Sequence, residues 1–291
     1  MTLVVGGVTP DIGFLVADTL LTFETYDPPK TVTNSHALKI QILNPDTAIA
    51  FAGDVETSLN IITKLNAELR QDQKISVCDR LLEFYKQRNR DCEFLVLQLT
   101  SDGKYLAHVT GERLSYCKRA YIGDGDQYKR MTELKQPYNP PKMQMVQQPD
   151  GTFRALPLVP SDGEREFEEI SRALEELTAR RAQGRYVSSV GAICGCVVRV
   201  VDARISGKLE YLQSGESSIF PWEGRSGFSL LASNSDVRGI AIYYRSGNMG
   251  FLFIVGDAEY CRREYAETLN KFVKMAKMKY GLALTGVGFS C

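Results

Sequence analysis

The sequence lacks an excess of charge of either sign and lacks any long apolar run. Its 35 Lys and Arg residues balance 35 Asp and Glu residues, so the composition does not point to nucleic acid or to an anionic membrane as a partner. No apolar run approaches the length of a membrane span, and no N-terminal stretch joins a basic region to a long apolar one. We therefore expect neither a transmembrane helix nor a signal peptide.

Several familiar catalytic and cofactor-binding motifs are also missing. His36 and His108 are the only histidines, and no serine lies in a G-x-S-x-G motif, so a Ser–His–Asp hydrolase is not expected. The segment 123–125 is not a phosphate loop, because no Lys-Ser/Thr follows it. Cys194 and Cys196 would share one face of a strand, but no second pair completes a zinc site. We expect no metal and no cofactor, and we interpret the seven cysteines as reduced thiols of a cytoplasmic protein.

What the chain does have is an alternation of short apolar segments, turns and amphipathic stretches. With 291 residues, of which 44% are apolar, it can form one large domain or two ordinary ones. Hairpins followed by helix pairs predict four layers, in the order helix, sheet, sheet, helix. The predicted strands are 3–7, 14–17, 37–43, 48–52, 93–99, 105–109, a strand ending at 121–125, 192–201, 209–212, 238–244 and 249–255; the predicted helices are 55–69, 77–87, 164–183 and 258–279.

Two regions stand apart from this pattern. Residues 136–163 are rich in Pro and Gln and are predicted to form an exposed insertion, long for a compact domain. Residues 222–291 are predicted to add a hairpin and a helix to a core formed by residues 1–221. This C-terminal extension could serve as a contact between subunits.

The most informative residue is Thr2. Removal of Met1, which the small size of threonine permits, would leave Thr2 with a free amine beside its own hydroxyl, and such an amine can act as the base for that hydroxyl. A nucleophile of this kind also needs a nearby cation, an acid that holds the cation, and backbone N–H groups for the oxyanion. The chain offers Lys39, Asp18 and the Gly53 turn for these three roles.

Each of these residues also has an ordinary structural interpretation. Lys39 could be a solvated lysine at a strand edge, and Asp18 could simply form the turn after a strand. Gly53 could only lead into a helix, which is compatible with an oxyanion role because helix N-termini favour anions. It is their order and spacing after Thr2 that favours the catalytic interpretation.

Four segments carry a resemblance to a known family. Thr2-Leu3-Val4-Val5, Val16-Ala17-Asp18, Leu38-Lys39-Ile40 and Phe51-Ala52-Gly53-Asp54 occur in the order found in proteasome β-type subunits, in a style close to their bacterial relatives. The stretch from Tyr121 to Tyr128 resembles the strand-to-helix turn of that family. The resemblance covers residues 2–131 well and residues 164–201 plausibly.

The resemblance implies an α+β fold of the N-terminal nucleophile hydrolase type, a four-layer αββα sandwich with two antiparallel sheets flanked by helices. It also implies a threonine-type endopeptidase that needs no cofactor. Thr2 would attack with its own amine as base, Lys39 would lower the pKa of that amine, Asp18 would pair with Lys39, and the Gly53 N–H would bind the oxyanion.

The sequence departs from the family pattern at two positions. Asp124 stands where the family usually has a serine, and Tyr186 stands where an acid is expected three residues before Ser189, which is retained. These positions normally steady the amine and a nearby water. Asp124 could take over the role of the missing acid; alternatively, activity is weak or lost.

The alignment also implies a substrate pocket beside Thr2. This pocket has no acid or base, so it should accept an apolar or small neutral side chain, because a charged one would be buried without a partner. The predicted lining is Leu21, Thr22, Ala37, Gln41, Phe51, Val55 and Leu59.

Three hypotheses follow. The first is a self-compartmentalising peptidase, a homo-oligomeric ring or spiral that degrades peptides or unfolded proteins, with an ATPase or activator as a further partner. The second is a non-peptidase amidase of the same fold, with residues 136–163 as a lid. The third is a catalytically silent scaffold, which the two departures favour.

Overall fold

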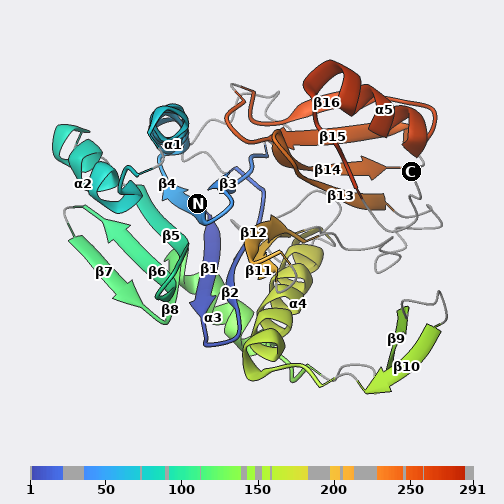
Figure 1. Ribbon diagram of the computed structural model, residues 1–291, viewed down its shortest axis with the longest axis horizontal. Helices are drawn as coiled ribbons and strands as arrows, with labels where there is room; N and C mark the ends of the chain where they lie inside the picture. The colour runs from blue at the N-terminus through green and yellow to red at the C-terminus, as the bar shows by residue number, and fades with distance from the viewer. Residues whose placement is uncertain are drawn as a thin grey trace.

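The computed structural model describes residues 2–21, 36–72, 74–88, 92–111, 113–138, 143–147, 153–157, 159–182, 197–203, 206–212, 228–244, 247–257 and 259–285. Within these ranges the chain forms sixteen strands and five helices (Figure 1). None of the described helices combines the length and the apolar character that a membrane crossing requires.

The N-terminal part of the chain builds two antiparallel sheets of five strands each. The first sheet has the order β12-β11-β2-β1-β8, and the second has the order β3-β4-β5-β6-β7. The strands of the first sheet are β1 (Leu3–Val8), β2 (Gly13–Ala17), β8 (Arg119–Gly123), β11 (Val198–Ala203) and β12 (Lys208–Tyr211). Those of the second are β3 (Ile40–Asn44), β4 (Thr47–Gly53), β5 (Cys92–Thr100), β6 (Gly103–Thr110) and β7 (Arg113–Cys117).

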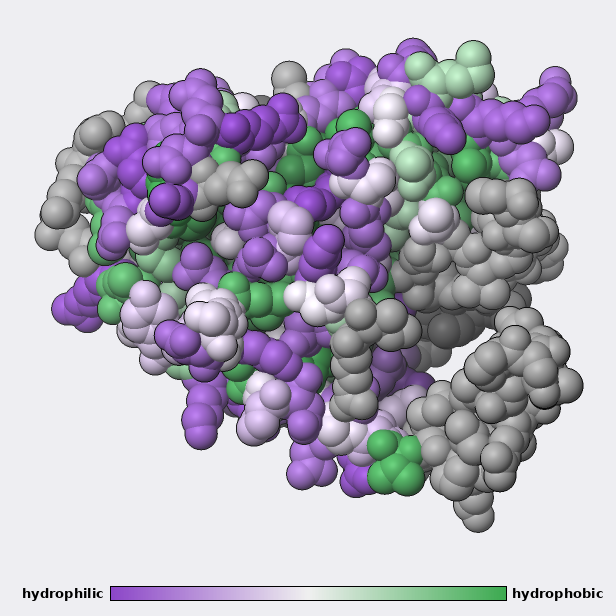
Figure 2. Space-filling view, in the orientation of Figure 1, coloured by the Kyte–Doolittle hydropathy of each residue, from purple (hydrophilic) through white to green (hydrophobic). Residues whose placement is uncertain are grey.

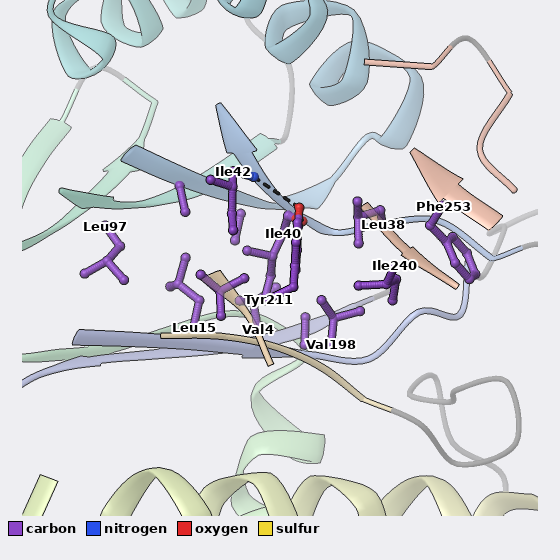
Figure 3. Close-up of a cluster of buried hydrophobic side chains, with 14 of the residues drawn as sticks. Val4, Leu15, Leu38, Ile40, Ile42, Leu97, Val198, Tyr211, Ile240 and Phe253 are labelled. Atoms are coloured by element: carbon purple, nitrogen blue, oxygen red, sulfur yellow. Dashed lines mark hydrogen bonds between the residues drawn. The ribbon is translucent and has the colours of Figure 1, made fainter. Parts of the chain in front are cut away.

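Apolar residues on both faces of the central strands explain how these sheets are covered. Because side chains alternate along a strand, Val4 and Leu15 point into the space between the sheets, whereas Val5 and Phe14 point away from it. The inter-sheet core contains Ile40, Leu97 and Val198 among others (Figure 3).

Four helices bury the outer faces of these sheets. Helices α3 (Gly125–Leu134) and α4 (Asp162–Ala182) cover the first sheet, and helices α1 (Val55–Gln71) and α2 (Val77–Arg88) cover the second. Apolar residues recur on one side of each helix, as an amphipathic helix requires.

A third sheet makes the two-sheet, four-layer prediction wrong. Strands β13 (Phe228–Asn234), β14 (Arg238–Tyr244), β15 (Met249–Ile254) and β16 (Arg262–Tyr265) form a separate four-stranded antiparallel sheet. Helix α5 (Leu269–Tyr280) packs on one face of this sheet, and the other face adds Ile240 and Phe253 to the inter-sheet core (Figure 3). The chain is therefore a three-sheet, strand-rich fold rather than two sheets enclosed by helices.

The sequence pattern near the C-terminus was misleading for a physical reason. Cys261, Tyr265 and Leu269 recur at helical spacing, which predicted a helix from residue 258. In the structure the helix begins only after Thr268, whose hydroxyl accepts a hydrogen bond from the Lys271 N–H at 3.2 Å. The preceding residues instead form β16, which completes the sheet by pairing with β15.

The predicted insertion contains regular structure of its own. Strands β9 (Met143–Gln147) and β10 (Phe153–Pro157) form a two-stranded hairpin that belongs to no other sheet (Figure 1). Helix α4 then begins at a reciprocal cap. The Ser161 N–H donates to Glu164 Oε2 at 2.8 Å, and the Glu164 N–H donates to Ser161 Oγ at 3.3 Å.

Tyr211 links the three sheets by hydrogen bonds at one end of the inter-sheet core. Its fully buried hydroxyl donates to the Ile40 carbonyl at 2.9 Å and accepts from the Ile42 N–H at 3.1 Å, so β12 of the first sheet is joined to the edge strand β3 of the second. The Asn234 side chain pairs with the backbone N–H and C=O of Tyr211 at 2.8 and 3.2 Å, which adds β13. Burial raises the pKa of Tyr211, so its hydroxyl keeps the proton that it donates.

Replacing Tyr211 with Phe should therefore destabilise the protein. The substitution keeps the ring but leaves the Ile40 carbonyl and the Ile42 N–H buried without their partner, which should lower the free energy of unfolding by about 1–3 kcal/mol. Urea denaturation measures the change. Tyr116→Phe is the matched control, because Tyr116 is 63% exposed and should change stability by no more than about 0.5 kcal/mol. Equal stability of the two variants would contradict this role for Tyr211.

Candidate active site

Thr2 is buried directly before β1, which lies between β2 and β8 in the first sheet. Leu3, the next residue, pairs with Gly123 of β8, and Val4 pairs with Ala17 at the end of β2. The Asp124 N–H donates to the Thr2 carbonyl at 2.7 Å. Because both neighbouring strands end here in the antiparallel sheet, the residues that follow them surround Thr2.

A glycine is required where β8 meets Thr2. Gly123 has a φ of +95°, and a Cβ atom at this position would lie 1.9 Å from the Thr2 carbonyl oxygen. Any other residue would be strained and would push Thr2 away. The same Cβ position is 3.4 Å from the Ala52 Cβ, so the end of β4 in the second sheet also reaches this point.

Asp18 and Lys39 form a buried ion pair beside Thr2. The Lys39 Nζ donates to Asp18 Oδ1 at 2.8 Å, and neither side chain is exposed to solvent. Asp18 Oδ1 also accepts the Leu3 N–H at 3.2 Å, and Oδ2 accepts the Leu20 N–H at 3.2 Å. The sequence left open whether Lys39 is a solvated strand-edge lysine, and the structure shows that it is not.

Burial has a direct consequence for the charge of Lys39. Removal from water lowers the pKa of the Lys39 ammonium, and the attraction of Asp18 opposes this change without cancelling it. The ammonium therefore releases a proton more readily than a surface lysine does. A lysine with a lowered pKa is suited to proton transfer.

The predicted oxyanion residue lies at the start of a helix. Gly53 ends β4 with a φ of +93°, and Asp54 then caps helix α1 by accepting the Thr57 N–H at 2.9 Å. This end of the helix carries the positive end of the helix dipole, which favours anions. The position of Gly53 is therefore compatible with stabilising a negative charge.

Asp124 has two structural tasks in this site. Its N–H holds Thr2, and its Oδ1 caps helix α3 by accepting the N–H groups of Asp126 and Gln127 at 3.0 and 3.1 Å. That Asp124 replaces the missing acid of the family remains a prediction. Ser189 and Tyr186 lie outside the described residues.

The residues of the predicted pocket are found near the β3 edge of the second sheet. Phe51 lies in the core beneath helix α1, and Gln41 pairs with Ile49 of that same core, so both side chains face the helix. Val55 and Leu59 are half-buried on α1 against this core. Leu21 and Ala37 are buried beside the bridge between Leu20 and His36, and Thr22 lies outside the described residues.

Gln41 has a feature that the sequence could not reveal. Its side chain is only 5% exposed, and its Oε1 has no hydrogen-bond partner within the described part of the chain. A buried amide oxygen in this condition costs free energy. A group that donated a hydrogen bond to it would relieve that cost.

Sequence reasoning also missed Glu93. Its Oε2 accepts the Gly123 N–H at 3.0 Å, so Glu93 supports the turn that holds Thr2. The signal was a charged residue at the start of an otherwise apolar strand. Among the described residues, no three His, Cys, Asp or Glu side chains are grouped so that they could hold a metal ion.

The buried pair makes a testable contribution to stability. Asp18→Asn or Lys39→Met leaves one buried charge unpaired, so each should lower the free energy of unfolding by about 3–5 kcal/mol, whereas the double variant should lose less than the two changes added together. Chemical denaturation of all three variants gives these values. Lys271→Met is the control, because it breaks an exposed pair with Glu267 and should cost at most about 1 kcal/mol. Single variants as stable as this control would contradict the role of the pair.

Comparison with known proteins adds nothing to this geometry. No protein-family model matches the chain, and no curated protein matches its sequence. The function therefore has to be argued from the residues around Thr2.

Proposed function

We propose that this protein is a threonine hydrolase that cleaves peptide bonds through an acyl-enzyme on Thr2. The observation that carries the proposal is the shared oxygen of Asp18. Asp18 Oδ1 binds both the Lys39 ammonium and the Leu3 N–H, so the buried cation lies next to the peptide bond that follows Thr2. A lysine that served only solubility would lie on the surface, whereas Lys39 is fully buried.

The proposed reaction begins when cleavage after Met1 frees the Thr2 amine. This amine accepts the proton of the Thr2 hydroxyl, and Oγ1 attacks the carbonyl carbon of the substrate. Lys39, as a neighbouring cation, lowers the pKa of the amine so that it is unprotonated before the attack. The Gly53 N–H donates to the oxyanion of the tetrahedral intermediate. The leaving amine takes the proton, and water then hydrolyses the ester and restores Thr2.

The surroundings of the site support a particular substrate class. The described residues of the predicted pocket are apolar apart from the neutral amide of Gln41, so we propose peptides or unfolded proteins with an apolar or small neutral side chain before the cleaved bond. Assembly into a homo-oligomeric ring or spiral in the cytoplasm, with an ATPase or activator, belongs to the same proposal. It is supported only by the resemblance to proteasome β-type subunits.

Thr2 itself provides the first test. After mass spectrometry has established that Met1 is absent, a β-lactone probe should add to Thr2, and peptide mapping should locate the adduct there. Thr2→Ala should lose the label, and Thr2→Ser, which keeps a hydroxyl, should retain it. Thr9→Ala is the control, because Thr9 lies in the β1–β2 turn at the other end of the strand. Labelling at another residue, or none in processed protein, would reject the hydrolase.

The same preparation distinguishes a peptidase from an amidase. A peptidase should release a fluorophore from short peptides, whereas an amidase of this fold should react with the probe and hydrolyse only a small amide. Processed protein that takes up no probe and cleaves neither substrate would support the silent scaffold.

Gln41 provides a test of the pocket. Gln41→Glu places a carboxylate where the neutral amide stood, so a basic side chain before the cleaved bond should gain a charged partner. The ratio of kcat/KM for a lysyl peptide to that for a leucyl peptide should rise by about ten-fold or more. Gln127→Glu is the control, because Gln127 is also buried but lies on helix α3. An unchanged ratio in the Gln41 variant would remove Gln41 from the pocket.

A further inference from the structure

A cavity lies beside β8, the edge strand of the first sheet. It has a volume of about 600 Å³ and opens where the edge strand of the first sheet passes over the second sheet. Its walls come from β5, β6, β7, β8 and the start of α3. Ligand cavities commonly have volumes of about 300–1,000 Å³, so this space is large enough for a small molecule or the end of a peptide.

Glu93 presents a carboxylate oxygen to this cavity beside His108. Its Oε2 is used by the Gly123 N–H, but its Oε1 lies 3.8 Å from His108 Nε2, which is too long for a hydrogen bond. His108 Nε2 is itself buried and has no hydrogen-bond partner in the described part of the chain. A glutamate carboxylate is ordinarily ionised near neutral pH, so Glu93 brings a negative charge to the cavity.

The other charged residue of the wall is already neutralised. The Arg119 guanidinium binds Glu166 through two contacts of 2.6 Å, Nε to Oε1 and Nη2 to Oε2. An anionic ligand would therefore meet the negative charge of Glu93 and find no free positive charge on Arg119. The cavity therefore presents the negative charge of Glu93, which a positively charged ligand would complement.

We propose that this cavity binds a protonated primary amine, with the ammonium between Glu93 Oε1 and His108 Nε2. An ammonium has three N–H donors and can donate to the carboxylate and to a neutral imidazole together. Tyr121 and Tyr128, stacked with their ring centroids 3.9 Å apart, form an aromatic wall along which the carbon chain of the amine would lie. The inference uses no part of the proposed reaction on Thr2.

The amine could come from a free diamine or from the N-terminus of a peptide, and the experiment separates these sources. Isothermal titration calorimetry of the wild-type protein should use 1,4-diaminobutane, alanyl-alanine amide and the N-acetylated form of that dipeptide. At least one of the two amines should bind with a dissociation constant of about 1 mM or tighter. The dipeptide binding more tightly would identify a peptide N-terminus, and the diamine binding more tightly would identify a free amine.

Charge dependence is the decisive feature. The acetylated dipeptide should bind about ten-fold or more weakly than the better amine, because it cannot supply a charged hydrogen bond. Glu93→Gln should weaken amine binding to a similar extent, while its amide oxygen can still accept the Gly123 N–H. Glu133→Gln is the matched control, since it removes one exposed negative charge from helix α3 away from the cavity.

Three results would overturn the proposal. They are the absence of binding by both amines, equal binding of the acetylated dipeptide, and unchanged amine affinity in Glu93→Gln. The first two come from the wild-type protein and do not depend on any variant. The third applies once the thermal melting temperature shows that Glu93→Gln is folded.

Discussion

The buried contact between Lys39 and Asp18 is the interaction on which the arrangement of this site depends. Two charges without access to water are tolerated only when each has good hydrogen-bond partners. Asp18 meets this condition by binding three groups. They are Lys39, which precedes β3, and the backbone N–H groups of Leu3 in β1 and of Leu20 after β2. The starts of β1 and β3 and the end of β2 are therefore held at one point, and Thr2 lies there.

The close approach of the β8 backbone to the backbone of Thr2 completes this arrangement. Gly123 lets β8 come within reach of Thr2, and the Asp124 N–H then fixes the Thr2 carbonyl. Glu93 supports the same turn from the second sheet by accepting the Gly123 N–H. Thr2 is consequently held by both sheets, so a change in the distance between the sheets would alter the geometry of the site.

The face of the molecule seen in Figure 2 is mainly hydrophilic with scattered hydrophobic residues, whereas the third sheet covers one end of the inter-sheet core. Tyr211 and the strands β13–β15 close the end of the inter-sheet core near β3. This cover stabilises the edge strand that carries Gln41, and β3 begins next to Lys39.

The sequence by itself determined the local elements and the candidates for chemistry. Alternation of apolar residues predicted β1 to β6 and their turns, helical spacing predicted α1, α2 and α4, and the order of Thr2, Asp18, Lys39 and Gly53 indicated a site at the ends of these strands. Local patterns determine such features because side-chain period and turn chemistry act within a few residues.

Only the tertiary structure decided which of these residues meet and how the last part of the chain folds. The burial of Lys39 and the contact of Glu93 with Gly123 depend on segments that are far apart in the sequence, so no local pattern predicts them. The same is true of Gln41 Oε1, which has no hydrogen-bond partner in the described part of the chain. The third sheet was missed because residues 258–268 have helical spacing. In the structure, residues 262–265 pair with β15 as a strand instead. Contacts across the fold outweigh local preference wherever they bury more surface or satisfy more hydrogen bonds.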